Sequence, residues 1–587
     1  MKRYIQQLTL AFSLFTIHYS LSAQTADQLF KAAGSPVNPK VVVSWNRYND
    51  HAAITAICKK IAVAYPDLAK LESIGKSYQG RDIWCLTVTD FKKGSPDKKP
   101  GMYVDGNIHS NEVQGAEFSL YTAWYLTESF NDTKFVQELL ADKVFYIVPT
   151  INPDGRDSYF HEPNTASSPR SGVIPVDNDR DGLVDEDGYD DLDNDKEILT
   201  MRRKNPTGRY RVDPTDPRRM IQVGPDEKGE YEILGQEGKD NDGDGQVNED
   251  GYTFEYDPNR DWGWGWQPNY IQNGAYKYPF SLPENRAVQE FVMKHPNIAA
   301  AQSFHNAGGM ILRGPGDPND LQTYNPQDLQ VYDVIGKKGE ELIPGYRYLV
   351  VYKDLYSAYG GELDWFYGEL DWFYGGRGIY TYSNELWTPY LFYNKDATRD
   401  PQDNTSFMFD RYTLFKDAFV DWHEFDHPQY GKIEIGGFKK NFGRAHPGFL
   451  LESDAHRNMS FLIYHCYHTP RLNVDTINEK DLGDGLKEIT AIISNSRLMP
   501  THSSQDLKYK IERADYITLS GVTVLAGMIV DNADLNISTE QKINPAAISV
   551  RNIPGLGTVT VRWIVQGSGK YTVTVDSKKG GLASKMN

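Results

Sequence analysis

The stretch that decides the fold is residues 102–126, MYVDGNIHSNEVQGAEFSLYTAWYL. The apolar run at Met102–Val104 predicts a buried strand, and the mostly apolar run at Val113–Leu126 predicts a largely buried helix. Between them, residues 106–112 (GNIHSNE) place a His and a Glu at a strand-to-helix turn. A His three residues before a Glu is common in surface turns, so this pair gains meaning only from partner residues elsewhere in the chain.

Three further segments are strand candidates that end at chemically useful residues, and the first of them is a continuous apolar run. Val144–Val148 leads into the turn residues Asn-Pro-Asp-Gly, Ile298–Phe304 ends at His305, and Gly378–Asn384 ends at Glu385. Alternation of such strands with helical segments predicts an α/β fold with a mixed or mainly parallel sheet covered on both faces. Ligands of open α/β sheets bind beyond the carboxyl ends of the strands, so we expect these residues to converge there.

His109, Glu112 and His305 together form a candidate zinc site. Two imidazoles and one carboxylate are a typical ligand set for a catalytic zinc ion, which keeps one position open for water. Glu385 is then the candidate general base that deprotonates this water as it attacks a carbonyl group.

Three further side chains are candidates for binding the oxyanion and the terminal carboxylate of a substrate. Arg203 offers a permanently charged guanidinium to an oxyanion. Asn259 and Arg260 are adjacent in sequence and can form a fork that recognises a terminal carboxylate.

Over residues 41–463 the chain resembles the zinc carboxypeptidases of the carboxypeptidase A and T type. The matches occur in the family's order and comprise Tyr65-Pro66, Ile74-Gly75-Lys76-Ser77 with Gly80-Arg81-Asp82-Ile83, Gly106-Asn107-Ile108-His109-Ser110 with Glu112, Asn152-Pro153-Asp154-Gly155, Arg203-Lys204-Asn205, Asn259-Arg260-Asp261-Trp262, Phe304-His305, Tyr356 with Gly360-Gly361 and Asp364-Trp365, and Asn384-Glu385-Leu386.

The resemblance implies an α/β fold with a mixed, mainly parallel sheet of about eight strands and helices on both faces. It also implies one catalytic zinc ion and a peptide substrate with a free C-terminus. The implied roles are zinc binding by His109, Glu112 and His305, general base and proton shuttle by Glu385, stabilisation of the tetrahedral intermediate by Arg203, binding of the substrate C-terminus by Asn259 and Arg260, and closure over the peptide by Tyr356.

One departure from the family pattern is a tandem repeat. The heptapeptide GELDWFY occurs at 361–367 and again at 368–374. Tyr356 keeps the family spacing to the first copy and Glu385 keeps it to the second, so one copy is an insertion in the wall of the specificity pocket. Relatives that release Lys or Arg often carry an Asp where this chain has Leu363 or Leu370. A basic C-terminal residue is therefore not favoured, unless an acid such as Asp317 enters the pocket from elsewhere.

Two acidic loops lie between the Asn-Pro-Asp-Gly turn and Asn259. Each repeats carboxylates at alternate positions with Gly at the sixth, the pattern by which calcium loops present converging oxygens. Neither has the usual Glu at position twelve, so the alternative is a solvated acidic insertion. The candidate calcium ligands are Asp177, Asp179, Asp181, Asp185 and Asp187 in the first loop and Asp240, Asp242, Asp244, Asn248 and Asp250 in the second, with Asp190–Asp195 as further candidates.

Length and composition indicate an exported protein of several domains. The 587 residues exceed the size of a single core. Residues 1–23 have the charged start, short apolar run and small-residue exit of a secretory signal, and no later run is long enough for a membrane span. We expect a periplasmic or extracellular location. We further expect a catalytic domain at 41–470, with an acidic insertion at about 171–251, and a β-sandwich at 472–587.

The sandwich is predicted from short β-branched runs at 488–494, 516–524, 547–553, 558–565 and 571–575, separated by turn residues. The net charge of −18 is concentrated in the acidic loops and no basic face is evident, which argues against a nucleic-acid partner.

Three functions agree with these residues. The first is an exported zinc metallocarboxypeptidase that acts on peptides. The second is a zinc peptidase of cell-wall stem peptides that contain D-amino acids or diaminopimelate. The third, a catalytically dead peptide-binding protein, is disfavoured because no expected ligand is missing and Glu385 is present.

Overall fold

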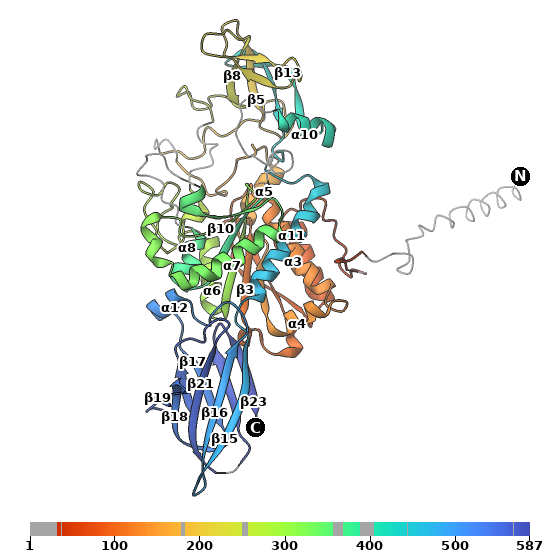
Figure 1. Ribbon diagram of the computed structural model, residues 1–587. Coiled ribbons are helices and arrows are strands. Elements are labelled where there is room, and N and C mark those ends of the chain that lie inside the picture. The colour runs from red at the N-terminus through yellow and green to blue at the C-terminus, as the bar shows by residue number, and fades with distance from the viewer. Residues whose placement is uncertain are drawn as a thin grey trace, which may run out of the picture.

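The computed structural model describes residues 32–36, 38–177, 182–248, 256–355, 368–387, 404–442, 444–567 and 569–587. An eight-stranded sheet with its covering helices forms the middle of the molecule. A six-stranded antiparallel sheet stands at one end, and two further antiparallel sheets formed by the C-terminal residues stand at the other (Figure 1).

The central sheet has the order β1-β2-β4-β3-β9-β12-β10-β11. Its four middle strands, β4, β3, β9 and β12, are parallel to one another, and antiparallel pairs occur toward both edges. This confirms the predicted mixed, mainly parallel sheet. The strands span Ala69–Lys76 (β1), Asp82–Val88 (β2), Gly101–Gly106 (β3), Val144–Val148 (β4), Ile298–Asn306 (β9), Met310–Arg313 (β10), Arg347–Val350 (β11) and Tyr380–Leu386 (β12).

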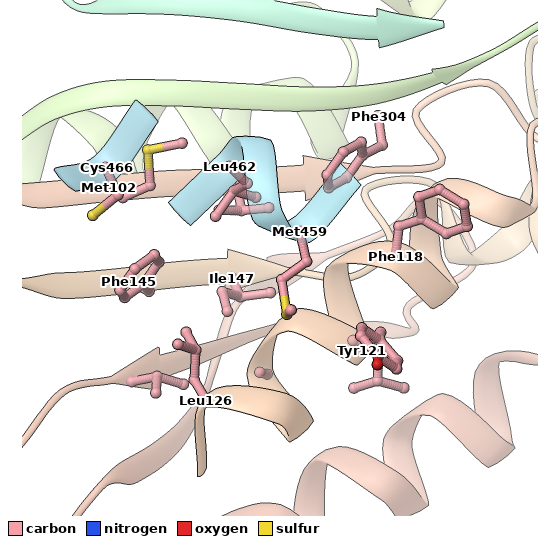
Figure 2. Packing of buried hydrophobic residues seen from close by; sticks show 14 of the residues in the cluster. Met102, Phe118, Tyr121, Leu126, Phe145, Ile147, Phe304, Met459, Leu462 and Cys466 are labelled. Carbon is pink, nitrogen blue, oxygen red and sulfur yellow. The ribbon is translucent and has the colours of Figure 1, made fainter. Parts of the chain in front are cut away.

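Helices cover both faces of this sheet. Met102 and Val104 of β3 point to one apolar cluster, and Tyr103 between them points to another, because successive strand residues face opposite sides. The first cluster includes α2, α3, α7 and α11, and the second includes α6; Figure 2 shows α3 and α11 packed over the strands. The main helices are His51–Ala64 (α2), Gln114–Glu128 (α3), Lys134–Asp142 (α4), Pro153–His161 (α5), Pro283–Lys294 (α6), Pro326–Leu342 (α7), Thr405–Thr413 (α10) and Gly448–Tyr467 (α11).

Adjacent parallel strands bring the predicted site residues to one edge. The chain leaves β3 at Gly106 and reaches His109 in the following turn. His305 lies near the end of β9, and Glu385 lies directly opposite it on β12. Because β3, β9 and β12 are neighbours and run in the same direction, their carboxyl ends form a single site.

The six-stranded sheet was not foreseen from the sequence. The acidic insertion supplies four of its strands, and a later hairpin supplies the other two. The order is β13-β14-β5-β8-β6-β7, with bounds Thr200–Lys204 (β5), Tyr210–Val212 (β6), Met220–Gln222 (β7), Tyr231–Gln236 (β8), Phe419–His427 (β13) and Gly431–Phe438 (β14). The pairing of β5 with β14 joins segments more than 200 residues apart, which local sequence patterns do not report.

The C-terminal strands form a five-stranded and a four-stranded sheet around one apolar cluster. The expected strand at 516–524 is two strands instead. Gly521 adopts a positive φ of 100°, and the chain passes there from β17 in one sheet to β18 in the other. The sheets contain Leu472–Gly483 (β15), Leu486–Asn495 (β16), Thr523–Asn532 (β18), Ile537–Glu540 (β19) and Thr558–Gln566 (β21), and Asp515–Ser520 (β17), Ala547–Val550 (β20), Thr572–Ser577 (β22) and Gly581–Met586 (β23).

The C-terminal part contacts the segment that leads into β12. Lys579 donates hydrogen bonds to the carbonyl oxygens of Arg377 and Gly378, at 2.9 and 3.1 Å. Ser503 donates to the same Gly378 oxygen, just before the short helix α12 (Ser504–Tyr509). These contacts lie at the opposite end of β12 from Glu385.

Within the described ranges, no helix combines the length and the apolar character needed to cross a membrane. The expected signal sequence at residues 1–23 lies outside the described residues.

Candidate active site

The turn that carries His109 and Glu112 is held by close backbone contact and by a buried Arg. A Cβ atom on Gly106 would lie 2.5 Å from the carbonyl group of Gly115, so Gly at this position lets β3 and α3 approach closely. Asn107 has a φ of 56° and donates its side-chain amide to the carbonyl oxygen of His109 at 2.7 Å. Arg156 in turn donates to the side-chain oxygen of Asn107 at 2.8 Å, which fixes the turn from the α5 side.

His109, Glu112 and His305 meet as a buried cluster of donor atoms. The two Nδ1 atoms lie 3.3 Å apart, and the Glu112 carboxylate oxygens lie 3.0 Å from each of them. All three residues are at most 3% exposed, and one ligand atom from each lies within 4.8 Å of the others. Two imidazole nitrogens and a carboxylate facing one point fit a zinc ion, because they are the donor types zinc prefers.

Each imidazole also contacts a second carboxylate through its other nitrogen. His109 Nε2 lies 2.8 Å from Asp257 Oδ1, and His305 Nε2 lies 2.5 Å from Glu369 Oε1. Such partners fix the tautomer and the ring orientation of metal-binding His residues. Sequence reasoning missed both acids, although Asp257 stands only two residues before Asn259.

Glu385 is paired with His305 across β12 and β9, and both side chains line one cleft. Burial, and next the negative charge of Glu112, raise the pKa of Glu385 to about 7, although His305 and Arg170 act in the opposite direction. A carboxylate with a pKa near neutrality is suited to accept a proton and to release it again.

Arg170, rather than Arg203, places a guanidinium beside Glu112 in this cleft. Arg170 lines the cleft, and its guanidinium lies 2.8 Å from Glu112 and 3.4 Å from Asp257. Burial opposes its charge, but Asp257, Glu112 and Glu385 hold the pKa of Arg170 above its usual value. Its side chain is 19% exposed.

Arg203 lies on β5 of the six-stranded sheet, where its Nε donates to Glu232 at 2.7 Å and its side chain is 40% exposed. The structure therefore does not bring Arg203 to the cleft. The expectation from sequence followed the local Arg-Lys pattern, but strand pairing within the insertion carries that pattern away from the site.

The cleft combines polar groups with an apolar wall. It encloses about 550 Å³, including the open space at its mouth, and Asn259 and Arg260 lie on its lining with His109 and His305. Leu312, Val351 and Leu370 belong to one apolar cluster that forms part of this lining. Asp317 is not among the lining residues, and its side chain accepts a hydrogen bond from the backbone of Asn319 at the start of the following 3-10 helix.

The second copy of the heptapeptide repeat forms part of the cleft wall. Gly368, Glu369, Leu370 and Asp371 all line it, and the short helix α8 spans Glu369–Asp371. Burial, and then the charge of Asp320, raise the pKa of Asp371 to about 8. The first copy and Tyr356 lie outside the described residues.

Carboxylates converge in the second acidic loop and in the Asp190–Asp195 segment that follows the first loop. The carboxylates of Asp240, Asp242 and Asp244 form one group of close oxygens, and those of Asp191, Asp193 and Asp195 form another. Two other candidate ligands instead join the loops to each other, because Asp187 accepts a hydrogen bond from the backbone of Asn248 at 2.9 Å.

In the first loop, Asp177 accepts from the backbone of Gly182 at 3.2 Å, and Asp185 accepts from that of Val176 at the same distance. Asp179, Asp181 and Asp250 lie outside the described residues.

A His-Glu-His donor cluster at the carboxyl edge of a mixed α/β sheet is the architecture of a metal-dependent hydrolase. The profile of the zinc carboxypeptidase family matches residues 54–407, which is more than half of the chain, and the chain belongs to that family. Residues 471–586 match the profile of a domain of unknown function.

Known relatives match over limited stretches. Carboxypeptidase B of Astacus astacus is 35% identical over 114 residues, which cover 19% of this chain and 35% of the relative. Carboxypeptidase M of Mus musculus is 32% identical over 19% of this chain and 25% of the relative. An inactive metallocarboxypeptidase of Ajellomyces capsulatus is 29% identical over 23% of this chain and 22% of the relative. The chain thus spans about a third or less of the length of these curated relatives.

Among solved structures, carboxypeptidase A of Helicoverpa armigera is similar with a TM-score of 0.42 and 15% identity, over 79% of this chain and 80% of the other. Thrombin-activatable fibrinolysis inhibitor is similar with a TM-score of 0.43 and 14% identity, over 74% and 78% of the two chains.

Proposed function

We propose that the protein is an exported zinc metallocarboxypeptidase that hydrolyses the C-terminal peptide bond of its substrates. The observation that carries this proposal is the meeting of His109, His305, Arg170, Arg260 and Glu385 on the lining of one cleft. A metal site, a base and cationic groups for a substrate carboxylate and an oxyanion are the parts that C-terminal hydrolysis needs.

Each side chain has a defined task in this proposal. Zinc held by His109, Glu112 and His305 would polarise the scissile carbonyl group and lower the pKa of water. Glu385 takes the proton from the attacking water on its carboxylate and passes it to the leaving amine, for which a pKa of about 7 is suitable. Arg170 faces the developing oxyanion with a fixed positive charge, the task expected of Arg203 from the sequence.

Two features of the cleft favour a particular kind of peptide. Asn259 and Arg260 present an amide and a guanidinium that suit the free C-terminal carboxylate of a substrate. The neighbouring wall contains Leu312, Val351 and Leu370, which favour an apolar side chain at the terminal position. Tyr356 remains predicted to close over the bound peptide.

The test is release of C-terminal amino acids from a mixed-sequence peptide library, with and without a zinc chelator. Glu385→Gln should keep its zinc and lose about 10²–10⁴-fold in kcat, because it removes the base and no ligand. Arg260→Ala should mainly raise KM for peptides with free C-termini and leave C-terminally amidated peptides unaffected. An unchanged kcat for Glu385→Gln would contradict the proposed mechanism.

Muropeptides with D-amino acid or diaminopimelate termini belong in the same assay. Cleavage of these substrates in preference to the peptide library would favour the cell-wall function. Zinc binding without cleavage of either substrate would favour a catalytically dead peptide-binding protein.

Two accessory proposals concern calcium and export. The convergence of Asp240, Asp242 and Asp244 supports a structural calcium ion that pins the insertion. Removal of calcium at constant zinc should then lower thermal stability, and no change would exclude this role. Residues 1–23 should be cleaved on export, which N-terminal sequencing of the mature protein in a fractionated culture would reveal.

A further inference from the structure

The two zinc-binding imidazoles are held by different carboxylates in different ways. Asp257 is fixed on several sides, because its carboxylate contacts His109, accepts from the backbone of Asn259 at 2.7 Å and lies 3.4 Å from Arg170. Glu369 contacts His305 through Oε1, and its Oε2 is buried without a hydrogen-bond partner within the described ranges. Glu369 is 1% exposed, so its position depends on the protein around it rather than on water.

The contacts of the two His305 ring nitrogens indicate that Glu369 selects the tautomer of this imidazole. His305 Nδ1 faces His109 and Glu112 at 3.3 and 3.0 Å, so it must offer its lone pair to a metal ion there. The proton of the neutral ring is then on Nε2, which lies 2.5 Å from Glu369 Oε1. A carboxylate that accepts this proton selects the tautomer and fixes the ring in its ligating orientation.

The backbone around Glu369 also contacts Asn259, which is proposed to bind the C-terminus of the substrate. Glu369 N donates to the side-chain oxygen of Asn259 at 2.9 Å. A Cβ atom on Gly368 would lie 2.7 Å from the same oxygen, so only Gly allows this approach. On the other side, Trp372 packs on Trp262 with ring centroids 5.3 Å apart. The second repeat copy is thus anchored between Asn259 and the core.

We propose that Glu369 is the positioning residue of His305, completing a second carboxylate–imidazole pair that matches Asp257 and His109. The second copy of the repeat thereby acquires a role in zinc binding, in addition to lining the cleft. Glu369 also links His305 to Asn259, so the residue that receives the substrate C-terminus contacts the element that orients a zinc ligand. This inference rests on the proposed zinc site, but not on the identity of the substrate.

The repeat itself supplies a matched control. Glu362 occupies the same position in the first copy of the heptapeptide as Glu369 does in the second. Glu362→Ala and Glu369→Ala therefore make the same change in identical heptapeptides. The zinc dissociation constant of the metal-free full-length protein would be measured by competition with a fluorescent zinc chelator. Glu369→Ala should weaken zinc binding by about 10–100-fold, as loss of a ligand's hydrogen-bond partner typically does. Glu362→Ala should stay within about twofold of the wild type.

Further variants separate positioning from folding. Glu369→Gln keeps the size and an acceptor oxygen, so it should recover part of the affinity lost in Glu369→Ala, while the melting temperature of the metal-free protein stays at the wild-type value. Zinc binding by Glu369→Ala within twofold of the wild type, or an equal loss in Glu362→Ala, would overturn the proposal. If Glu369→Ala does not fold, Glu369→Gln with wild-type zinc affinity would overturn it. Weakened zinc binding in a protein that cleaves no peptide would refute only the proposed function.

Discussion

A buried charge network lies where the C-terminal part contacts the segment that leads into β12. It should make the unfolding free energy of this protein depend on pH between about 6 and 10. His502 Nδ1 lies 3.1 Å from Asp506, and its Nε2 lies 3.2 Å from Asp515. Lys579 contacts the same Asp506 oxygen at 3.1 Å while it donates to the Gly378 carbonyl oxygen. Although burial opposes its charge, hydrogen bonds to Asp506 and Asp515 raise the pKa of His502 to about 9.

The size and sign of the effect follow from that shift. The ordinary pKa of His is about 6.5, so folding raises it by about 2.5 units, and each unit corresponds to about 1.4 kcal/mol. A raised His pKa stabilises the folded state fully below about pH 6.5, and this stabilisation is lost as the pH rises through about 9. Titration of His502 should therefore remove up to about 3 kcal/mol of unfolding free energy between pH 6 and pH 10.

The measurement is urea-induced unfolding of the full chain at about pH 6, 8 and 10, for the wild type and His502→Gln. The advantage of the wild type should be largest at pH 6 and shrink by about 3 kcal/mol at pH 10. His465→Gln is the control, because burial and then the charge of His468 lower the pKa of His465 to about 3 in the folded protein, so the advantage of the wild type over this variant should not shrink as the pH rises. A constant gap between wild type and His502→Gln across this range would refute the reasoning.

Three other outcomes are expected from the structure. Arg170→Ala should lower kcat by about 10²–10³-fold, whereas Arg203→Ala should stay within about threefold of the wild type; steady-state kinetics with zinc-loaded enzyme would show the reverse order if Arg203 served the site. Gly106→Ala should cost about 1–3 kcal/mol and reduce bound zinc, because the new methyl group meets the Gly115 carbonyl; unchanged melting and metal content would contradict this. Trp563→Ala should cost about 3–5 kcal/mol in urea unfolding, because the side chain is fully buried between the C-terminal sheets; a loss below about 1 kcal/mol would contradict that packing.

Part of the eight-stranded sheet was predictable because some of its strands are buried, mostly apolar runs. Val144–Val148 is an unbroken apolar run and Ile298–Asn306 begins with four apolar residues, and both strands are buried along their whole length. The six-stranded sheet had no such signal. The strands that the insertion supplies to it, such as Thr200–Lys204, are short and partly exposed and include charged residues.

Sequence alone identified the residues whose geometry is set locally or by strand order. The strand-to-helix turn fixes His109 and Glu112 relative to each other, and the parallel strands carry His305 and Glu385 to the same edge. Only the tertiary structure decided which Arg and which acids surround them. Arg170, Asp257 and Glu369 reach the cluster through loops and a short helix, and no periodicity in the sequence records where such segments return. Strand pairing within the insertion removed Arg203 from the site for the same reason, since a motif specifies local residues but not the partner strand beside which they lie.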